Sequence, residues 1–247
     1  MNLLSTKYNQ LTEPNVAKID YSDPSTRFAY IYRYVTCHAN LVYRLISTSN
    51  RLTKLFKAEQ VTISCVGGGP GSDLLGAIKY YADHDSLSKL KCYLLDGNKA
   101  WNESWSDVDK KVDSKLCLSV NFMPLDVTER NTWLPYKKYL QADLFTLVYF
   151  ISELYRFRNQ CTDYFNYLFS EAKSNSYMLF IDNNSANFYN WFDSLTQNYD
   201  WEVLEKDECN IQLDTDKEKT DLGEYFKKFG CPKLEANVAY RIIRKNG

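Results

Sequence analysis

Apolar runs and helical repeats alternate along most of this chain, and the alternation predicts an α/β protein. Five short apolar segments bounded by polar residues or glycine are predicted strands: 61–66, 90–95, 116–125, 144–151 and 177–181. Apolar residues at helical spacing follow each of them, over 72–81, 100–112, 133–140, 159–172 and 186–195. Two last strands, within 201–213 and at 238–243, flank the charged segment 214–228, which we expect to be a loop with a short helix.

Strands separated by helices imply a parallel sheet with right-handed crossovers. The last two strands lack a full crossover helix and therefore predict an antiparallel hairpin. The predicted fold is a doubly wound, mostly parallel sheet of seven strands whose last strand is antiparallel. Ligands of such sheets bind beyond the carboxyl ends of the strands, so the polar residues that end these strands are expected to face one crevice.

A helical extension is predicted before the first strand. Residues 1–22 are polar and irregular, and Asp23-Pro24 then has the pattern of an N-cap followed by the first residue of a helix. Helical spacing continues to about Phe56, with a break at 47–50. We therefore divide the chain into an extension, 1–58, and a main domain, 59–247.

The stretch 61–76 carries the most specific signal. A β-branched apolar strand runs into the glycine-rich turn 67–71, and Ser72 and Asp73 then open a helix. Glycine lets a ligand approach the main chain, and a helix N-terminus suits an anionic or polar group. The alternation G-x-G-x-G does not meet the G-x-G-x-x-G dinucleotide spacing, and no Walker A lysine follows. A tight structural turn is the simpler alternative.

Composition narrows the function classes. The chain has 247 residues and a formal net charge of −1, which gives no electrostatic footprint for a long nucleic acid. Its seven cysteines are scattered without a C-x-x-C pair, so neither a disulfide framework nor a metal site is expected. No signal-peptide core and no membrane-spanning apolar run is found, so we expect a soluble, cytoplasmic protein.

The glycine loop and the order of elements resemble the class I S-adenosylmethionine-dependent methyltransferases over roughly residues 59–247. The resemblance implies S-adenosylmethionine as cofactor. The main-chain contacts would come from the glycine loop, the ribose contact from Asp96, and the adenine contacts from Asp126 and Val127. The fourth-strand end, from Phe150 to Glu153, would lie near the methionine end and the acceptor. The cofactor-binding residues so implied are Gly67, Gly68, Gly69, Gly71, Asp73, Asp96, Asp126, Val127 and Ser152.

Each of these assignments has a structural alternative. Asp96 is also a suitable turn residue, and Asp126 a suitable helix cap. Ser152 and Glu153 fit a helix cap and first turn. The chain departs from the family pattern at Cys65, where an acidic residue usually precedes the glycines; Asp73 is a hypothetical substitute that would hold the methionine ammonium. Trp101 would either flank the adenine or pack in the core.

The acceptor is less defined. The chain lacks the N/D-P-P-Y/F motif of amino-methylating nucleic-acid enzymes and the Pro-Cys pair of cytosine-C5 enzymes, which disfavours nucleic acid. The extension is the expected substrate lid, with Tyr30, Arg33, Tyr34 and His38 as contact candidates. His38 and Glu153 are the candidate catalytic residues, although a surface histidine is the simpler interpretation of His38. Residues after the fifth strand would line the acceptor pocket: Asp182, Asn183, Tyr189 and Trp191.

Three hypotheses follow. The first is a methyltransferase that acts on a small-molecule or protein acceptor. The second is a non-catalytic S-adenosylmethionine-binding module that acts by protein interaction. The third, an NAD-dependent oxidoreductase, is disfavoured by the glycine spacing.

Overall fold

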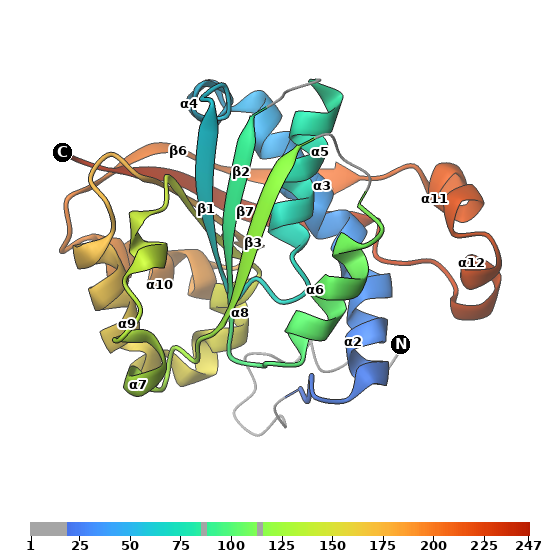
Figure 1. Ribbon diagram of the computed structural model, residues 1–247, viewed down its shortest axis with the longest axis horizontal. Coiled ribbons are helices and arrows are strands. Elements are labelled where there is room, and N and C mark those ends of the chain that lie inside the picture. Colours follow the sequence, from blue (N-terminus) through green and yellow to red (C-terminus); the bar gives the residue numbers. More distant parts are fainter. Residues whose placement is uncertain (1–18, 85–87, 113–115) are drawn as a thin grey trace.

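A seven-stranded sheet runs through the computed structural model, which describes residues 19–84, 88–112 and 116–247 (Figure 1). The strand order is β3-β2-β1-β4-β5-β7-β6. Strands β1 to β5 pair in parallel, and β7 is antiparallel to both of its neighbours, β5 and β6. The predicted sheet with a reversed last strand is confirmed. The strands are β1 (Gln60–Val66), β2 (Lys89–Asp96), β3 (Cys117–Pro124), β4 (Leu144–Val148), β5 (Tyr177–Asn183), β6 (Trp201–Gln212) and β7 (Glu235–Lys245).

Helices cover both faces of the sheet and bury one apolar core on each (Figure 1). On one face lie α3 (Thr36–Thr48), α4 (Asn50–Leu55), α5 (Ser72–Asp83) and α6 (Trp101–Asp109). On the other lie α9 (Arg158–Glu171) and α10 (Ala186–Thr196). The strand order reverses between β1 and β4, so the carboxyl ends of these two strands open the crevice in which such sheets bind ligands.

The N-terminal extension begins as predicted. Asp23 caps α2 (Pro24–Tyr30), and its Oδ2 accepts a hydrogen bond from the Thr26 N–H at 2.8 Å. A π-helical turn, η1 (Ile31–Val35), connects α2 to α3, and extended backbone at Ser49 separates α3 from α4. Residues 1–18 lie outside the described residues. The division at residue 58 stays a prediction, although α3 packs directly on α5 of the main domain.

Two element predictions on the β4 side were wrong. The strand predicted over 144–151 ends at Val148, because Tyr149 has a φ of 55° and the short helix α8 (Phe150–Leu154) begins after it. The single helix predicted over 133–140 is instead α7 (Arg130–Trp133) and the 3₁₀ turn η2 (Lys138–Gln141). Pro135 lies between them, where its ring and missing N–H prevent a continuous helix. A second 3₁₀ turn, η3 (Tyr155–Phe157), connects α8 to α9.

The charged segment after β6 is more helical than predicted. It forms α11 (Thr215–Leu222) and α12 (Glu224–Phe229), where we expected a loop with one short helix. Asp214 caps α11, and its Oδ1 accepts hydrogen bonds from the Asp216 and Lys217 N–H groups. Neither helix has a buried residue, and both project from the β6–β7 hairpin (Figure 1). A side-chain cap thus begins α11, whereas α12 has no such cap and packs Phe229 against Phe28 and Tyr32 of the extension.

Candidate functional site

The glycine turn after β1 uses backbone conformations that side chains disfavour. Gly67, Gly69 and Gly71 have φ angles of 68°, 49° and 87°, all in the left-handed region. A Cβ on Gly67 would lie 2.0 Å from Cδ2 of Phe150, the first residue of α8. Glycine at position 67 therefore permits both the turn and the close approach of the β4 end to the β1 end.

Asp96 connects the end of β2 to this turn. Its Oδ2 accepts a hydrogen bond from the Gly69 N–H at 3.1 Å, and its Oδ1 accepts one from the Asn98 N–H at 2.8 Å. Asp96 is thus a turn residue, as one alternative from the sequence stated. Each carboxylate oxygen has two lone pairs, so ligand hydroxyls can donate to the same group. Ribose binding by Asp96 stays a prediction.

Asp126 and Val127 follow β3 at the same edge of the sheet. The Oδ1 of Asp126 accepts hydrogen bonds from the Thr128 N–H at 2.9 Å and from the Thr128 hydroxyl at 2.7 Å. This is an Asx turn and not a helix cap, because the N-cap of the following helix is Glu129. Val127 is buried and supplies an apolar surface beside the carboxylate.

These strand ends line a cavity of about 560 Å³. Its size is within the range of pockets that bind small molecules. It brings together six residues that the sequence singled out, namely Gly67, Asp96, Asp126, Val127, Phe150 and Glu153. The remaining lining residues are Ile19, Tyr21, Gly97, Asn98, Lys99, Leu125, Thr128, Leu154, Arg156, Phe157 and Gln160.

Other predicted site residues lie behind this cavity and do not line it. A Cβ on Gly68 would meet Leu94 at 2.5 Å, and one on Gly71 would meet Trp105 at 2.7 Å. Gly69 acts through its N–H on Asp96. Ser152 is buried, and its N–H donates to Asp182 Oδ2 at 2.8 Å. These residues hold the lining residues in place from behind the cavity wall. Direct contacts between them and a cofactor stay predictions.

Asp73 lies in the core. Its side chain accepts a hydrogen bond from the Thr146 hydroxyl at 2.5 Å, and the residue is buried. Burial raises the pKa of Asp73 to about 6, and it does the same for Asp182 at the end of β5. The structure does not bring Asp73 to the cavity wall, so a role toward the methionine ammonium stays a hypothesis.

Aromatic side chains from the N-terminal segment cover one side of the cavity. The Tyr21 hydroxyl donates to Glu153 Oε1 at 3.4 Å, and its ring centroid lies 5.0 Å from that of Trp101. Tyr30 packs on the same indole at 5.4 Å. Trp101 is buried against both rings and does not line the cavity, which favours the packing interpretation. Sequence reasoning missed Tyr21, because it lies in a segment without apolar periodicity.

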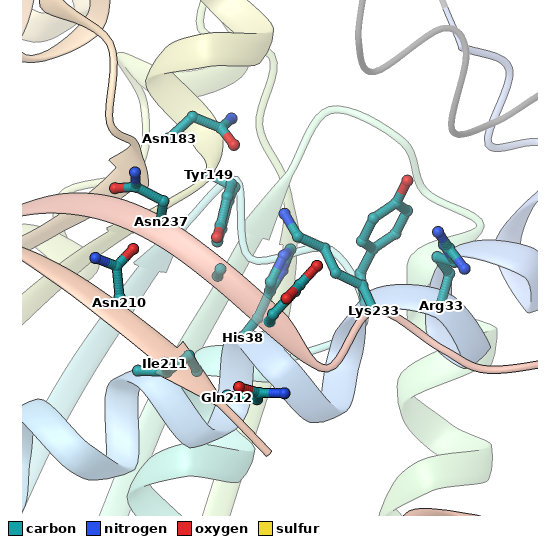
Figure 2. A pocket seen from close by; sticks show the side chains of 12 residues that line it. Arg33, His38, Tyr149, Asn183, Asn210, Ile211, Gln212, Lys233 and Asn237 are labelled. Atoms are coloured by element: carbon teal, nitrogen blue, oxygen red, sulfur yellow. The ribbon is translucent and has the colours of Figure 1, made fainter. Parts of the chain in front are cut away.

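A second cavity, of about 820 Å³, lies between the extension and the β6–β7 hairpin (Figure 2). Four residues that the sequence proposed as contacts line it: Arg33, Tyr34, His38 and Asn183. Tyr30, Asp182, Tyr189 and Trp191 do not line it. Sequence reasoning missed the hairpin residues, which no motif marks: Asn210, Ile211, Gln212, Lys233, Glu235, Ala236 and Asn237. Tyr149 completes the lining.

His38 is a buried histidine and not a surface one. Its ring stacks on Tyr149 with a centroid distance of 4.0 Å. Burial, and secondarily the charge of Lys233, lowers the pKa of His38 to about 3. The imidazole is therefore neutral near pH 7 and a weak proton acceptor, which argues against its predicted role as a base.

Within the described ranges, no three His, Cys, Asp or Glu side chains are grouped as a metal site. No helix in those ranges has the length and apolar character needed to cross a membrane.

Comparison with known proteins shows the fold. No family model matches the sequence, and a search of curated proteins gives no significant match. Among solved structures, an inferred RNA methyltransferase from Pyrococcus horikoshii is similar at 12% identity and a TM-score of 0.50, with all of both chains covered. The 16S rRNA methylase ArmA is similar at 14% identity and a TM-score of 0.50, over 99% of this chain and 96% of its own. At these identities the likeness establishes the architecture and leaves the substrate open.

Proposed function

We propose that this chain, whose fold is that of the class I methyltransferases, is an S-adenosylmethionine-dependent methyltransferase with a small-molecule or protein acceptor. One observation carries the proposal. The ends of β1, β2, β3 and β4 meet at a single 560 Å³ cavity, and Gly67, Asp96 and Asp126 lie on its wall. This is the crevice at which a sheet with this strand order binds ligands.

The residues present fit the cofactor. The carboxylate of Asp96 would accept hydrogen bonds from the two ribose hydroxyls. Val127 and Leu125 would hold the apolar faces of the adenine, and Asp126 would accept from its exocyclic amine. Gly67, which lines the cavity at the end of β1, would face the methionine portion. Since Cys65 is apolar and buried, Glu153 is the lining carboxylate at the β4 end that would face the methionine ammonium.

S-adenosylmethionine, when bound, supplies a methyl group on an electrophilic sulfonium. The chain would orient the cofactor and the acceptor and would exclude water from the site. Tyr21 and Glu153 close one side of the cavity through their hydrogen bond. Phe150 packs on Gly67 and fixes the β4 end, at which the acceptor would meet the cofactor.

Calorimetric titration with S-adenosylmethionine and S-adenosylhomocysteine tests the assignment. We expect micromolar binding by wild type, no competition by NAD, and at least roughly tenfold (1.4 kcal/mol) weaker binding by Asp96→Ala, because two charge-assisted hydrogen bonds are lost.

Asp107→Ala is the matched control, since Asp107 is an exposed carboxylate on α6 that does not line the cavity. It should bind like wild type. Folded wild-type protein that binds neither compound would remove the proposal. Tight binding without transfer to any acceptor would favour the non-catalytic alternative.

A further inference from the structure

Lys233 brings a positive charge into the second cavity, and no acidic residue of the described part of the chain forms an ion pair with it. Its Nζ lies 5.2 Å from the centroid of the Tyr149 ring. Figure 2 shows the Lys233 side chain extending toward Tyr149 and His38. The amides of Asn183, Asn210 and Asn237 lie on the side of the cavity away from the Lys233 backbone. Among the residues described, none forms an ion pair or hydrogen bond with this Nζ. A half-buried charge without a partner is unfavourable, so an anionic ligand would be stabilised there.

The charges around Lys233 leave it short of negative charge. Burial is the main cause that lowers the pKa of Lys233, and nearby Arg33 acts in the same direction. Cys37 is the largest influence in the opposite direction, followed by Asp182 and Glu235. Asp182, however, is buried and already accepts hydrogen bonds from two backbone N–H groups, those of Ser152 and Asn183. Glu235 is exposed at the cavity rim.

Hydrogen bonds to the extension hold the segment that carries Lys233 in place. The Lys233 N–H donates to the Arg33 carbonyl at 2.8 Å, and the Arg33 guanidinium donates to the Cys231 carbonyl at 2.9 Å. These bonds attach the segment that precedes β7 to η1 of the extension. The ammonium is therefore presented by a fixed backbone, which lowers the ordering cost of binding a ligand.

The rest of the wall is polar. The strand register places Asn210 opposite Asn237 at the hairpin. The two ring nitrogens of His38 and the hydroxyl of Tyr149 are buried, and they have no hydrogen-bond partner in the part of the chain that the structure describes. Buried polar atoms usually have partners, so this wall has unused capacity to donate and accept hydrogen bonds. Amide side chains offer both donors and acceptors to a polar ligand.

We propose that the second cavity binds the methyl acceptor. The acceptor is a small polar molecule with an anionic group, either a carboxylate or a phosphate, which Lys233 holds. This rests on the proposed function. Tyr149, which lines this cavity, directly precedes Phe150, which lines the cofactor cavity, so the two sites adjoin at the end of β4. A volume of 820 Å³ fits a small molecule, and the net charge of −1 does not favour an RNA backbone.

Matched probe pairs test the proposal. Succinate with succinamide tests a carboxylate, and glycerol 3-phosphate with glycerol tests a phosphate. Each would be titrated calorimetrically into wild type saturated with S-adenosylhomocysteine. We expect at least one anion to bind about tenfold more tightly than its neutral partner, and we expect Lys233→Gln to abolish the difference. Lys233→Arg should retain it.

Lys206→Gln is the control, because Lys206 is exposed on β6 of the same hairpin and does not line the cavity. It should behave like wild type. The proposal is overturned if neither anion is preferred, if Lys233→Gln keeps the preference, or if only an RNA oligonucleotide binds through Lys233. An anion preference in a protein that does not bind S-adenosylhomocysteine would overturn the acceptor role and the proposed function together, while the anion site itself would remain.

Discussion

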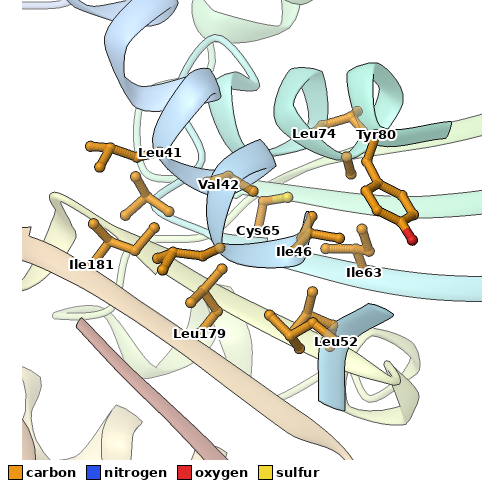
Figure 3. Packing of buried hydrophobic residues seen from close by; sticks show 14 of the residues in the cluster. Leu41, Val42, Ile46, Leu52, Ile63, Cys65, Leu74, Tyr80, Leu179 and Ile181 are labelled. Atoms are coloured by element: carbon orange, nitrogen blue, oxygen red, sulfur yellow. The ribbon is translucent and has the colours of Figure 1, made fainter. Parts of the chain in front are cut away.

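Gly76→Val is expected to destabilise the protein by roughly 3 kcal/mol, the upper end for overpacking a core. A Cβ at position 76 would lie 2.5 Å from the Ala39 carbonyl oxygen, 2.8 Å from Val42 Cβ and 3.0 Å from the Tyr43 nitrogen. Two of these three atoms are backbone, so relief requires α3 and α5 to separate. Figure 3 shows what that would disturb, since Val42 and Leu74 on these helices pack beside Cys65 of β1.

Urea denaturation of wild type, Gly76→Val and Ala82→Val measures the effect. Ala82 is exposed on the same helix, so its replacement reports only the lower helix propensity of valine, about 0.6 kcal/mol. Gly76→Ala should fall between the two valine variants, because it adds the same Cβ but improves helix propensity. Equal losses for the two valine variants would show that α3 and α5 do not pack as described.

The fold was predictable because its signals are local. A β-branched run before Gly67 and helical spacing after Ser72 identify β1 and α5 without tertiary information. Asp23-Pro24 fixes the start of α2 in the same way. Once the order of strands and helices is known, topology alone brings Asp96 and Asp126 to the edge where Gly67 lies.

The misses have tertiary causes. The apolar run at 144–151 does not reveal where β4 ends. The strand stops because Tyr149 has a left-handed backbone conformation, and its buried ring stacks on His38. Lys233 could not be assigned to a site, since no motif marks it and its cavity exists only where the hairpin meets the extension. His38 looked like a surface residue because helical spacing alone does not show which face a second layer covers.

Asp73→Asn is expected to flatten the dependence of stability on pH. The pKa of Asp73 is about 6 in the folded protein and about 3.8 without burial. Between these values the folded state binds more protons than the unfolded state, so the contribution of Asp73 is fully present below pH 3.8 and is lost as the pH rises through 6. A difference of about two units corresponds to about 3 kcal/mol, which the asparagine variant would not lose.

Urea midpoints from pH 4 to pH 8 give this comparison, with Asp107→Asn as an exposed control. Asp182 contributes the same pH dependence of stability to every variant, so its contribution cancels in the comparison. Parallel profiles for wild type and Asp73→Asn would mean that the Asp73 carboxyl does not share the buried site of Thr146. The same variant tests the second hypothesis for this residue. Asparagine keeps the acceptor for the Thr146 hydroxyl. If Asp73 is only a core residue, Asp73→Asn should leave the affinity for S-adenosylmethionine unchanged. If Asp73 holds the methionine ammonium, the variant should bind S-adenosylmethionine about tenfold more weakly.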